Sequence, residues 1–142
     1  MREIKFRAWD KKNEAYLYDV QNASDMFSNV KYENGENADC DEECFAGFLY
    51  DERYDIEQYV GLHDKNGREI YESDILRVTT GEDGESYIAT VKWFGDEGYP
   101  AFDLKDIPAA WNYDANALTT IFRSGVETCE VIGNIHEDKT TN

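Results

Sequence analysis

The sequence predicts a mainly β protein with minor α content, an α+β chain in which short antiparallel strands dominate. Three observations support this prediction. Ten tyrosines, seven phenylalanines and three tryptophans give the 142 residues an aromatic content that is typical of sheets. Apolar residues recur in several short runs with the period of two that strands require. Gly, Asp and Asn residues separate these runs at close spacing, as turns do in antiparallel structures.

Residues 3–20 predict a β-hairpin. In the run IKFRAWD, residues 4–10, even and odd positions fall on opposite faces of an extended chain, which is the signature of a strand. The segment DKKN breaks this alternation, because Asp and Asn tolerate turn dihedral angles and can bond to their own backbone. AYLYDV, residues 15–20, then returns as the second strand.

Residues 21–57 have a different character. Asn, Asp, Glu and Ser dominate this segment, and its apolar residues come in short clusters. Within it, DEECFAGFLYDE predicts a short helix whose inward residues are Cys44, Phe48 and optionally Phe45. Gly47 weakens this helix by up to about 1 kcal/mol relative to Ala.

The run YVGLHDKNGREIYESDILRV, residues 59–78, predicts three strands separated by two turns. Asn66-Gly67 is the strongest hairpin signal, because both residues can take positive φ at little cost. Asp74 is expected to accept a backbone N–H from the next strand, in which Leu76 and Val78 share one face. The carboxylates of this region are therefore predicted to mark turns rather than a reactive site.

The rest of the chain continues with short strands. SYIATVKWF, residues 86–94, alternates but carries apolar residues on both faces, and AFDL and ETCEVIGNI predict two further strands. Between these two, a helix is expected with Leu118, Ile121 and Phe122 inward and Gly125 at its end. This succession of strands indicates a small barrel or sandwich without parallel pairing. The last residues, HEDKTTN, are expected to fray.

The predicted organisation has two parts. Residues 1–57 form an amino-terminal hairpin and acidic segment, and residues 58–142 form the barrel region; one continuous domain is the alternative. A similar D-K turn before a Tyr occurs in both parts, but two hairpins with the same turn chemistry explain it without duplication.

Three pieces of the chain together resemble the YopX family: MREIKFRAWD at residues 1–10, YVGLHDKNGREIYESDIL at 59–76 and EVIGNIHED at 130–138. The resemblance implies a phage or prophage origin, a bacterial cytoplasmic setting and a carboxy-terminal barrel of the SH3-like type. It implies no particular biochemical activity and assigns no catalytic residue. Ser73 stands where the family usually has Gly, so a turn that demands positive φ there would be strained. Val60 and His136 also depart from the family pattern.

The charge of the chain disfavours direct binding of nucleic acid. The net charge is -17, and residues 33–57 alone hold ten acidic side chains and one basic one. Affinity for a phosphate backbone comes from Lys and Arg, so a surface of this sign repels it. The sequence also has no apolar run of the roughly 20 residues that cross a membrane and no signal peptide at its start, which predicts a cytoplasmic protein.

The candidate metal ligands are weak. Cys40 and Cys44 could form a zinc site with Cys129, His63 and His136, but zinc sites usually pair their ligands closely on both halves. The odd number of cysteines fits free thiols better than disulfides. The acidic cluster Asp39, Asp41, Glu42 and Glu43 does not match a calcium loop. We therefore expect no metal and no cofactor.

Catalysis is also not indicated. The sequence has no nucleophile elbow, phosphate-binding loop or zinc-protease motif. The aromatic residues of the barrel region lie near turns, where SH3-like folds often present a binding groove, although aromatic residues are also ordinary barrel core. The expected partner-binding residues are Trp93, Tyr99, Trp111 and Tyr113.

Three functional hypotheses follow. The leading one is a non-enzymatic, phage-encoded module that binds a host or phage protein, with homo-oligomerisation left open. The second is a nucleic-acid mimic, in which the carboxylates of residues 33–57 take the place of phosphates and occupy a host DNA-binding protein. The third is a metal-dependent phosphate-processing enzyme, which would require carboxylates that converge in one cleft.

Overall fold

The computed structural model describes residues 4–22, 30–32, 45–80, 84–95, 98, 101–108, 116–125 and 127–137. In these residues the chain is mainly β with two α-helices, which confirms the predicted fold class. The chain divides into two compact units, Met1–Tyr59 and Val60–Asn142, here called unit 1 and unit 2.

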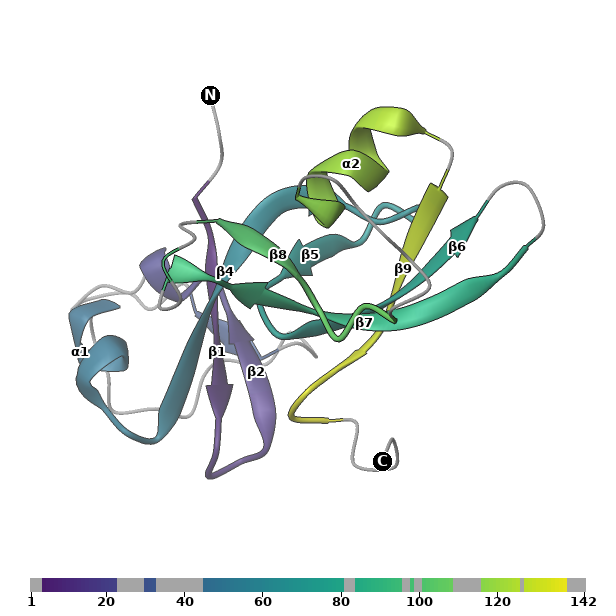
Figure 1. Cartoon of the computed structure of the whole chain (residues 1–142). Helices are drawn as coiled ribbons and strands as arrows, with labels where there is room; N and C mark the ends of the chain where they lie inside the picture. The colour runs from purple at the N-terminus through teal and green to yellow at the C-terminus, as the bar shows by residue number, and fades with distance from the viewer. Residues whose placement is uncertain are drawn as a thin grey trace. The chain divides into compact units, whose positions relative to one another are not determined.

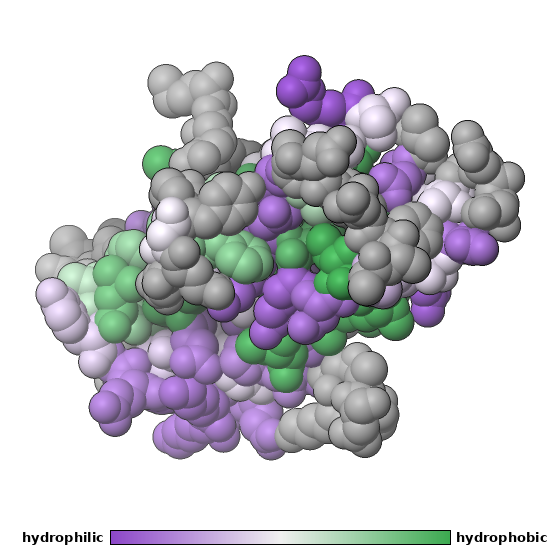
Figure 2. Space-filling model, viewed as in Figure 1, coloured by the Kyte–Doolittle hydropathy of each residue, from purple (hydrophilic) through white to green (hydrophobic). Residues whose placement is uncertain are grey.

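Unit 1 is built on an antiparallel sheet in which the first strand lies between β2 and β4 (Figure 1). Its described elements are β1 (Phe6–Asp10), β2 (Ala15–Tyr18), the 3-10 helix η1 (Val20–Asn22), β3 (Lys31–Tyr32), α1 (Phe45–Tyr50) and the first part of β4 (Tyr54–His63). In the register of β1 and β2, Ala8 lies opposite Leu17, so the predicted hairpin is confirmed. Figure 2 shows hydrophilic side chains gathered around its turn, residues 11–14.

The apolar core of unit 1 covers one face of this sheet. Its buried residues come from both strands of the hairpin, from α1 and from the segments between them: Ala8, Leu17, Val20, Val30, Phe48 and Tyr54. Phe48 is fully buried, and Phe45 packs on Phe6 with ring centroids 4.8 Å apart, as the helix prediction required. Cys44 lies outside the described residues.

The opposite face of the same sheet carries a buried ion pair. Arg7 on β1 lies opposite Glu57 on β4, and its Nε donates to Glu57 Oε1 over 2.8 Å. The Tyr16 hydroxyl donates to the same oxygen, and the Arg7 guanidinium carbon lies 4.1 Å from the Tyr16 ring centroid. Because Arg7 is only 2% exposed, this charge depends on its partners for the solvation that it has lost.

A second buried carboxylate holds the hairpin turn. Asp10 is fully buried; its Oδ1 accepts the Lys12 N–H over 3.0 Å, and its Oδ2 accepts Asn13 Nδ2 over 2.9 Å. Arg53 donates to both oxygens over 2.8 Å, through Nε and Nη2. The DKKN segment thus forms the predicted turn by bonding to its own backbone, with a bidentate Arg pair added from beyond α1.

Unit 2 contains a second antiparallel sheet, a half-barrel with the order β8-β7-β6-β9. Its described elements are the end of β4, β5 (Glu69–Tyr71), β6 (Asp74–Thr80), β7 (Ser86–Trp93), β8 (Phe102–Lys105), α2 (Ala117–Ser124) and β9 (Glu127–Asn134). Strand β5 pairs with β4. Helix α2 lies along β8 and β9 (Figure 1). The pairs β6–β7, β6–β9 and β7–β8 are all antiparallel.

The core of unit 2 lies between the inner face of this sheet and α2. It contains alternate residues of the strands and one stripe of the helix: Ile70, Leu76, Val78, Tyr87, Ala89, Val91, Leu104, Ala117, Leu118, Ile121, Cys129 and Val131. Leu76 and Val78 share the inner face, and Leu118 and Ile121 point inward, as predicted. Phe122 is half-buried against this core.

Two turn predictions need correction. The hairpin at Asn66-Gly67 exists, but only Gly67 takes positive φ, at 83°. The loop holds three residues between Asp64 and Arg68, whose backbones bond over 2.8 Å, so a left-handed Gly ends the turn instead of two left-handed residues. Asp74 does accept a backbone N–H, but from Tyr71 in the preceding strand, over 2.8 Å. The Asp74 side chain therefore closes the turn between β5 and β6, which precedes it in the chain.

Ser73 occupies the strained position that its departure from the family pattern implied. Its φ is 74°, in the left-handed region that Gly adopts freely and other residues avoid. The surrounding backbone holds it there, because the Ser73 N–H donates to Val91 O over 2.9 Å and the Ser73 carbonyl accepts the Ile135 N–H over 3.1 Å.

Among the described residues, no helix is long and apolar enough to span a membrane.

Candidate functional site

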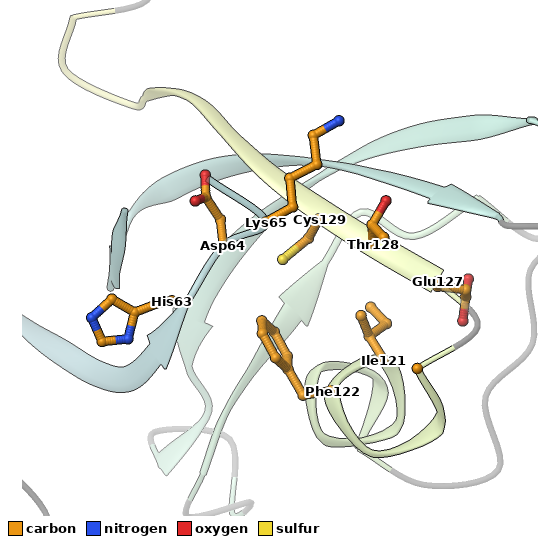
Figure 3. A pocket seen from close by; sticks show the side chains of 9 residues that line it. His63, Asp64, Lys65, Ile121, Phe122, Glu127, Thr128 and Cys129 are labelled. Carbon is orange, nitrogen blue, oxygen red and sulfur yellow. The ribbon is translucent and has the colours of Figure 1, made fainter. Parts of the chain in front are cut away.

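Unit 2 holds a pocket of about 270 Å³ between α2, β9 and the turn that joins β4 to β5 (Figure 3). The residues that line it come from these three elements and from the link between α2 and β9: His63, Asp64, Lys65, Ile121, Phe122, Gly125, Glu127, Thr128 and Cys129. All of them belong to unit 2.

Helix α2 supplies the apolar wall. The helix begins at an Asn116 N-cap, whose side chain accepts the Thr119 N–H over 2.8 Å, and ends at Gly125 with φ of 71°. These caps fix which residues face the sheet. Ile121 and Phe122 extend from the helix toward Cys129 on β9 (Figure 3). Ile121 is buried, whereas Phe122 keeps part of its ring exposed to the pocket.

The turn wall is held by Asp64. Its Oδ1 accepts the backbone N–H groups of Asn66 and Arg68, each over 2.9 Å, and its Oδ2 accepts that of Val131 over 2.9 Å. Burial alone would raise the pKa of Asp64, but these backbone hydrogen bonds hold the pKa below its ordinary value. An ionised carboxylate therefore braces the turn against β9, and its oxygens are occupied by the protein itself.

Cys129 forms the inner surface of the pocket. Its side chain is buried, and burial together with the negative charge of Asp64 raises the pKa of the thiol to about 11. The thiolate is the reactive form of cysteine, so the neutral thiol at physiological pH behaves as a small apolar group. This environment is the reverse of the electropositive one that activates a nucleophilic cysteine.

Charged groups stand at the edges of the pocket. Figure 3 shows the Lys65 side chain extending away from Ile121 and Phe122, while Glu127 lies beside the end of α2. His63 lines the opposite end. Of the predicted zinc ligands, His63 and Cys129 thus share one pocket, but Cys40 and Cys44 lie outside the described residues. Within the described ranges, no group of three His, Cys, Asp or Glu side chains is arranged to hold a metal ion.

Both open edges of the half-barrel are covered where the pocket elements meet them. On β9, the Cys129 carbonyl accepts the Lys65 N–H over 3.0 Å, and the Val131 N–H donates to Asp64. On β8, the Phe102 carbonyl accepts Asn116 Nδ2 over 2.9 Å, while the Leu104 N–H donates to Asp103 Oδ1 over 2.8 Å. Edge groups that are already bonded cannot pair with an added strand, so these positions resist strand addition.

The predicted partner-binding residues are only partly described. Trp93 lies at the end of β7, is 39% exposed and meets Phe102 edge to face, with ring centroids 5.0 Å apart. Tyr99, Trp111 and Tyr113 lie outside the described residues, so their role in partner binding stays a prediction. Trp93 does not line the pocket.

Sequence reasoning did not find this pocket. It placed Ile121 and Phe122 on the inner side of the helix and assigned Asp64 to a turn, but nothing in their spacing joined the two segments. The usable signal was the helix ending at Gly125 only two residues before Glu127, which brings the end of α2 close to the start of β9.

The comparisons with known proteins decide the family. A family model described as YopX protein matches residues 5–140, nearly the whole chain. The chain belongs to the YopX family. Among solved structures, it is similar to protein EF1440 from Enterococcus faecalis, with 21% sequence identity, a TM-score of 0.53 and 96% of each chain covered. At this identity, the likeness to EF1440 shows a shared fold. A search of curated proteins finds no match.

Proposed function

We propose that this YopX-family chain is a non-enzymatic protein-binding module, encoded by a phage or prophage, that acts in the bacterial cytoplasm on a host or phage protein. Family membership supports the origin, because the family resemblance carries that setting with it. One observation supports the binding role: unit 2 has a pocket with an apolar wall, beside which the Cys129 thiol keeps its proton and the Asp64 carboxylate is bonded to backbone N–H groups.

Two of the groups in the pocket that could react, a carboxylate and a thiol, are poorly disposed to do so. Asp64 uses its carboxylate on three backbone N–H groups, which leaves it poorly placed as a general base. Cys129 is buried and carries its proton at neutral pH, which disfavours nucleophilic attack. A pocket built in this way is suited to holding an apolar group.

The covered sheet edges support a particular mode of binding. A peptide that joined this sheet as a further strand would need backbone groups at one of its two edges. Those of Cys129 and Val131 on β9, and those of Phe102 and Leu104 on β8, already have partners. Insertion of a side chain into the pocket needs none of them. We also propose partner contacts for Trp93 and for Tyr99, Trp111 and Tyr113, which lie outside the described residues. A second copy of the chain is among the candidate partners.

The test is affinity capture with mass spectrometry from lysate of infected or lysogenic host cells. Wild-type protein is compared with Phe122→Ala, which removes part of the pocket wall, and Trp93→Ala, which removes the exposed ring. The proposal expects a reproducible partner whose recovery falls in at least one variant. Failure of the wild-type chain to recover any reproducible partner contradicts it.

The nucleic-acid mimic gains little support from the described part of residues 33–57. There, Glu57 is buried against Arg7, Asp55 lies 3.4 Å from Lys11, and Asp51 accepts the Arg53 N–H, whereas Glu52 is exposed. Carboxylates that bond within the protein are less suited to take the place of phosphates. The remaining acids of the segment lie outside the described residues, and the metal-dependent enzyme likewise has no specific observation in its favour.

A further inference from the structure

We infer that the unit 2 pocket receives one large apolar side chain from a positively charged segment of the partner protein. This inference rests on the proposed binding function and names the chemistry that the partner must present. Four observations carry it: the size of the pocket, its apolar wall, the acidic net charge of the chain and the covered strand beside the pocket.

The size of the pocket suits a single side chain. Pockets that bury a complete small ligand usually enclose roughly 300–1,000 Å³. The volume here is about 270 Å³, at the lower end of that scale. A single Phe, Leu or Met side chain can enter such a hollow while the rest of the partner remains on the surface.

The wall selects an apolar side chain. Ile121, Phe122 and the protonated Cys129 thiol form the inner surface, and the polar atoms of Asp64 are directed to backbone N–H groups. A polar side chain placed against these three residues would lose water there, since the other polar residues of the lining lie around them (Figure 3). An aromatic side chain gains more, because the half-buried ring of Phe122 offers an aromatic contact beyond the area buried.

The net charge of the chain favours a basic segment. At the pocket itself, charges of both signs are present: Asp64 and Glu127 are acidic, and Lys65, which extends away from the apolar residues (Figure 3), is basic. The chain as a whole has a net charge of -17, which attracts cationic partners over long range and repels anionic ones.

Because the edge of β9 is covered here, the affinity of a partner segment depends on the inserted side chain. Because Lys65 and Asp64 already bond to β9, a partner segment cannot obtain affinity from main-chain pairing at these positions. Its binding energy must come from the buried anchor and from charge. Truncation of a central anchor typically costs 2 kcal/mol or more in an interface, which corresponds to a loss of affinity of about 30-fold.

The experiment is an NMR titration of the full ¹⁵N-labelled chain with synthetic peptides. The probes are acetylated, amidated Lys-Arg-Phe-Arg-Lys, its Ala-for-Phe analogue, and Glu-Glu-Phe-Glu-Glu. The inference expects the basic Phe peptide to shift the amide signals of Phe122, Thr128 and Cys129. The Ala analogue and the acidic peptide are each expected to bind at least tenfold more weakly, and added salt is expected to weaken the basic peptide.

Two pairs of variants locate the site. Phe122→Ala and Glu127→Lys should each reduce binding of the basic Phe peptide at least fivefold. Their matched controls, Phe45→Ala, which removes a half-buried ring in unit 1, and Glu85→Lys, which reverses an exposed charge in unit 2, should leave it unchanged. Retained amide spectra establish that each variant is folded.

The outcomes separate this inference from the proposed function. Absence of shifts at the pocket with millimolar basic Phe peptide, or equal binding of the acidic peptide, overturns the inference. If affinity capture still recovers a partner in that case, the binding function stands and the partner uses another surface. If affinity capture recovers no partner but the basic Phe peptide binds, the proposed cellular role is contradicted. The inferred chemistry of the pocket is then still supported.

Discussion

The carboxylate of Asp64 accepts a hydrogen bond from the backbone N–H of Val131 over 2.9 Å, although the two residues are 67 positions apart in the chain. The same side chain closes the turn that follows β4. One turn residue therefore also fixes the edge of β9 and one wall of the pocket. Sequence reasoning assigned Asp64 to the turn, but it could not predict the contact with β9 or the place of this residue in the pocket wall.

Substitution of Asp64 by Ala is expected to destabilise unit 2 by about 2–3 kcal/mol. The turn N–H groups of Asn66 and Arg68 can turn to water, but the N–H of Val131 is buried and would lose its acceptor. Hydrogen exchange of the Val131 amide should accelerate strongly. The control is Asp55→Ala, which removes a half-exposed ion pair with Lys11 and should cost under about 1 kcal/mol. Equal losses in both variants would refute the special role of Asp64.

Substitution of Ser73 by Gly is expected to stabilise the protein by about 1 kcal/mol. The left-handed backbone of Ser73 costs roughly 1–2 kcal/mol for a residue with a side chain, while Gly adds only about 0.4–1 kcal/mol of unfolded-state entropy. Urea unfolding followed by circular dichroism measures the change. Gly67→Ala is the reverse control: its φ is 83° and a Cβ would meet nothing within 4 Å, so any destabilisation reports backbone strain alone. A destabilised Ser73→Gly variant would contradict the strain.

The contribution of Asp10 to stability should disappear in acid. Burial alone would raise the pKa of Asp10, but hydrogen bonds from Arg53 and Asn13 and from the Lys12 backbone hold the pKa below its ordinary value of 3.8. The folded state therefore binds this proton less readily than the unfolded state does, so the stabilisation is present above pH 3.8 and is lost as the pH falls through the lower folded pKa.

The measurement is the difference in unfolding free energy between the wild-type protein and Asp10→Asn from pH 7 to pH 2. Other acidic groups contribute to both proteins, so the difference isolates Asp10. It should stay constant down to about pH 5 and then shrink. A difference that does not depend on pH would mean that the carboxylate is not ionised against Arg53.

The Cys129 thiol should resist alkylation in the folded protein. A pKa raised from 9.0 to about 11 leaves about 100-fold less thiolate at pH 8 than an ordinary cysteine has, and burial slows access further. Peptide mapping after brief iodoacetamide treatment measures the Cys129 peptide alone. The same peptide from urea-unfolded protein is the control and should react fully. Comparable rates in the two states would show that the thiol is accessible and that its pKa is not raised.

The buried pair of Arg7 and Glu57 should show strong coupling. Glu57→Leu removes the carboxylate that faces a buried guanidinium, so a loss of about 3–5 kcal/mol is expected. The double variant Arg7→Leu, Glu57→Leu should recover part of this loss, because no charge then remains buried. A double-mutant cycle measured by urea unfolding tests the coupling, and additive effects would contradict it.

The sequence alone determined the local structure of the chain. Period-two alternation located β1 and β7, because each side of a strand has its own environment, and the turn after β1 indicated β2 as the returning strand. The turn residues Asp10, Asp64 and Gly125 were assigned correctly, since their roles depend on neighbours within a few positions. The family resemblance found in three short motifs was confirmed across residues 5–140.

Only the tertiary structure decided which of these local pieces meet. The pairing of Arg7 with Glu57 required β1 and β4 to align in one register, and the pocket required α2, β9 and a turn 60 residues earlier to converge. Alternation predicts that Arg7 and Phe6 lie on opposite faces of β1, but it does not predict that both faces of the sheet become buried. Such contacts depend on long-range packing, which no period within one strand or helix encodes, and this is why the candidate site was invisible in the sequence.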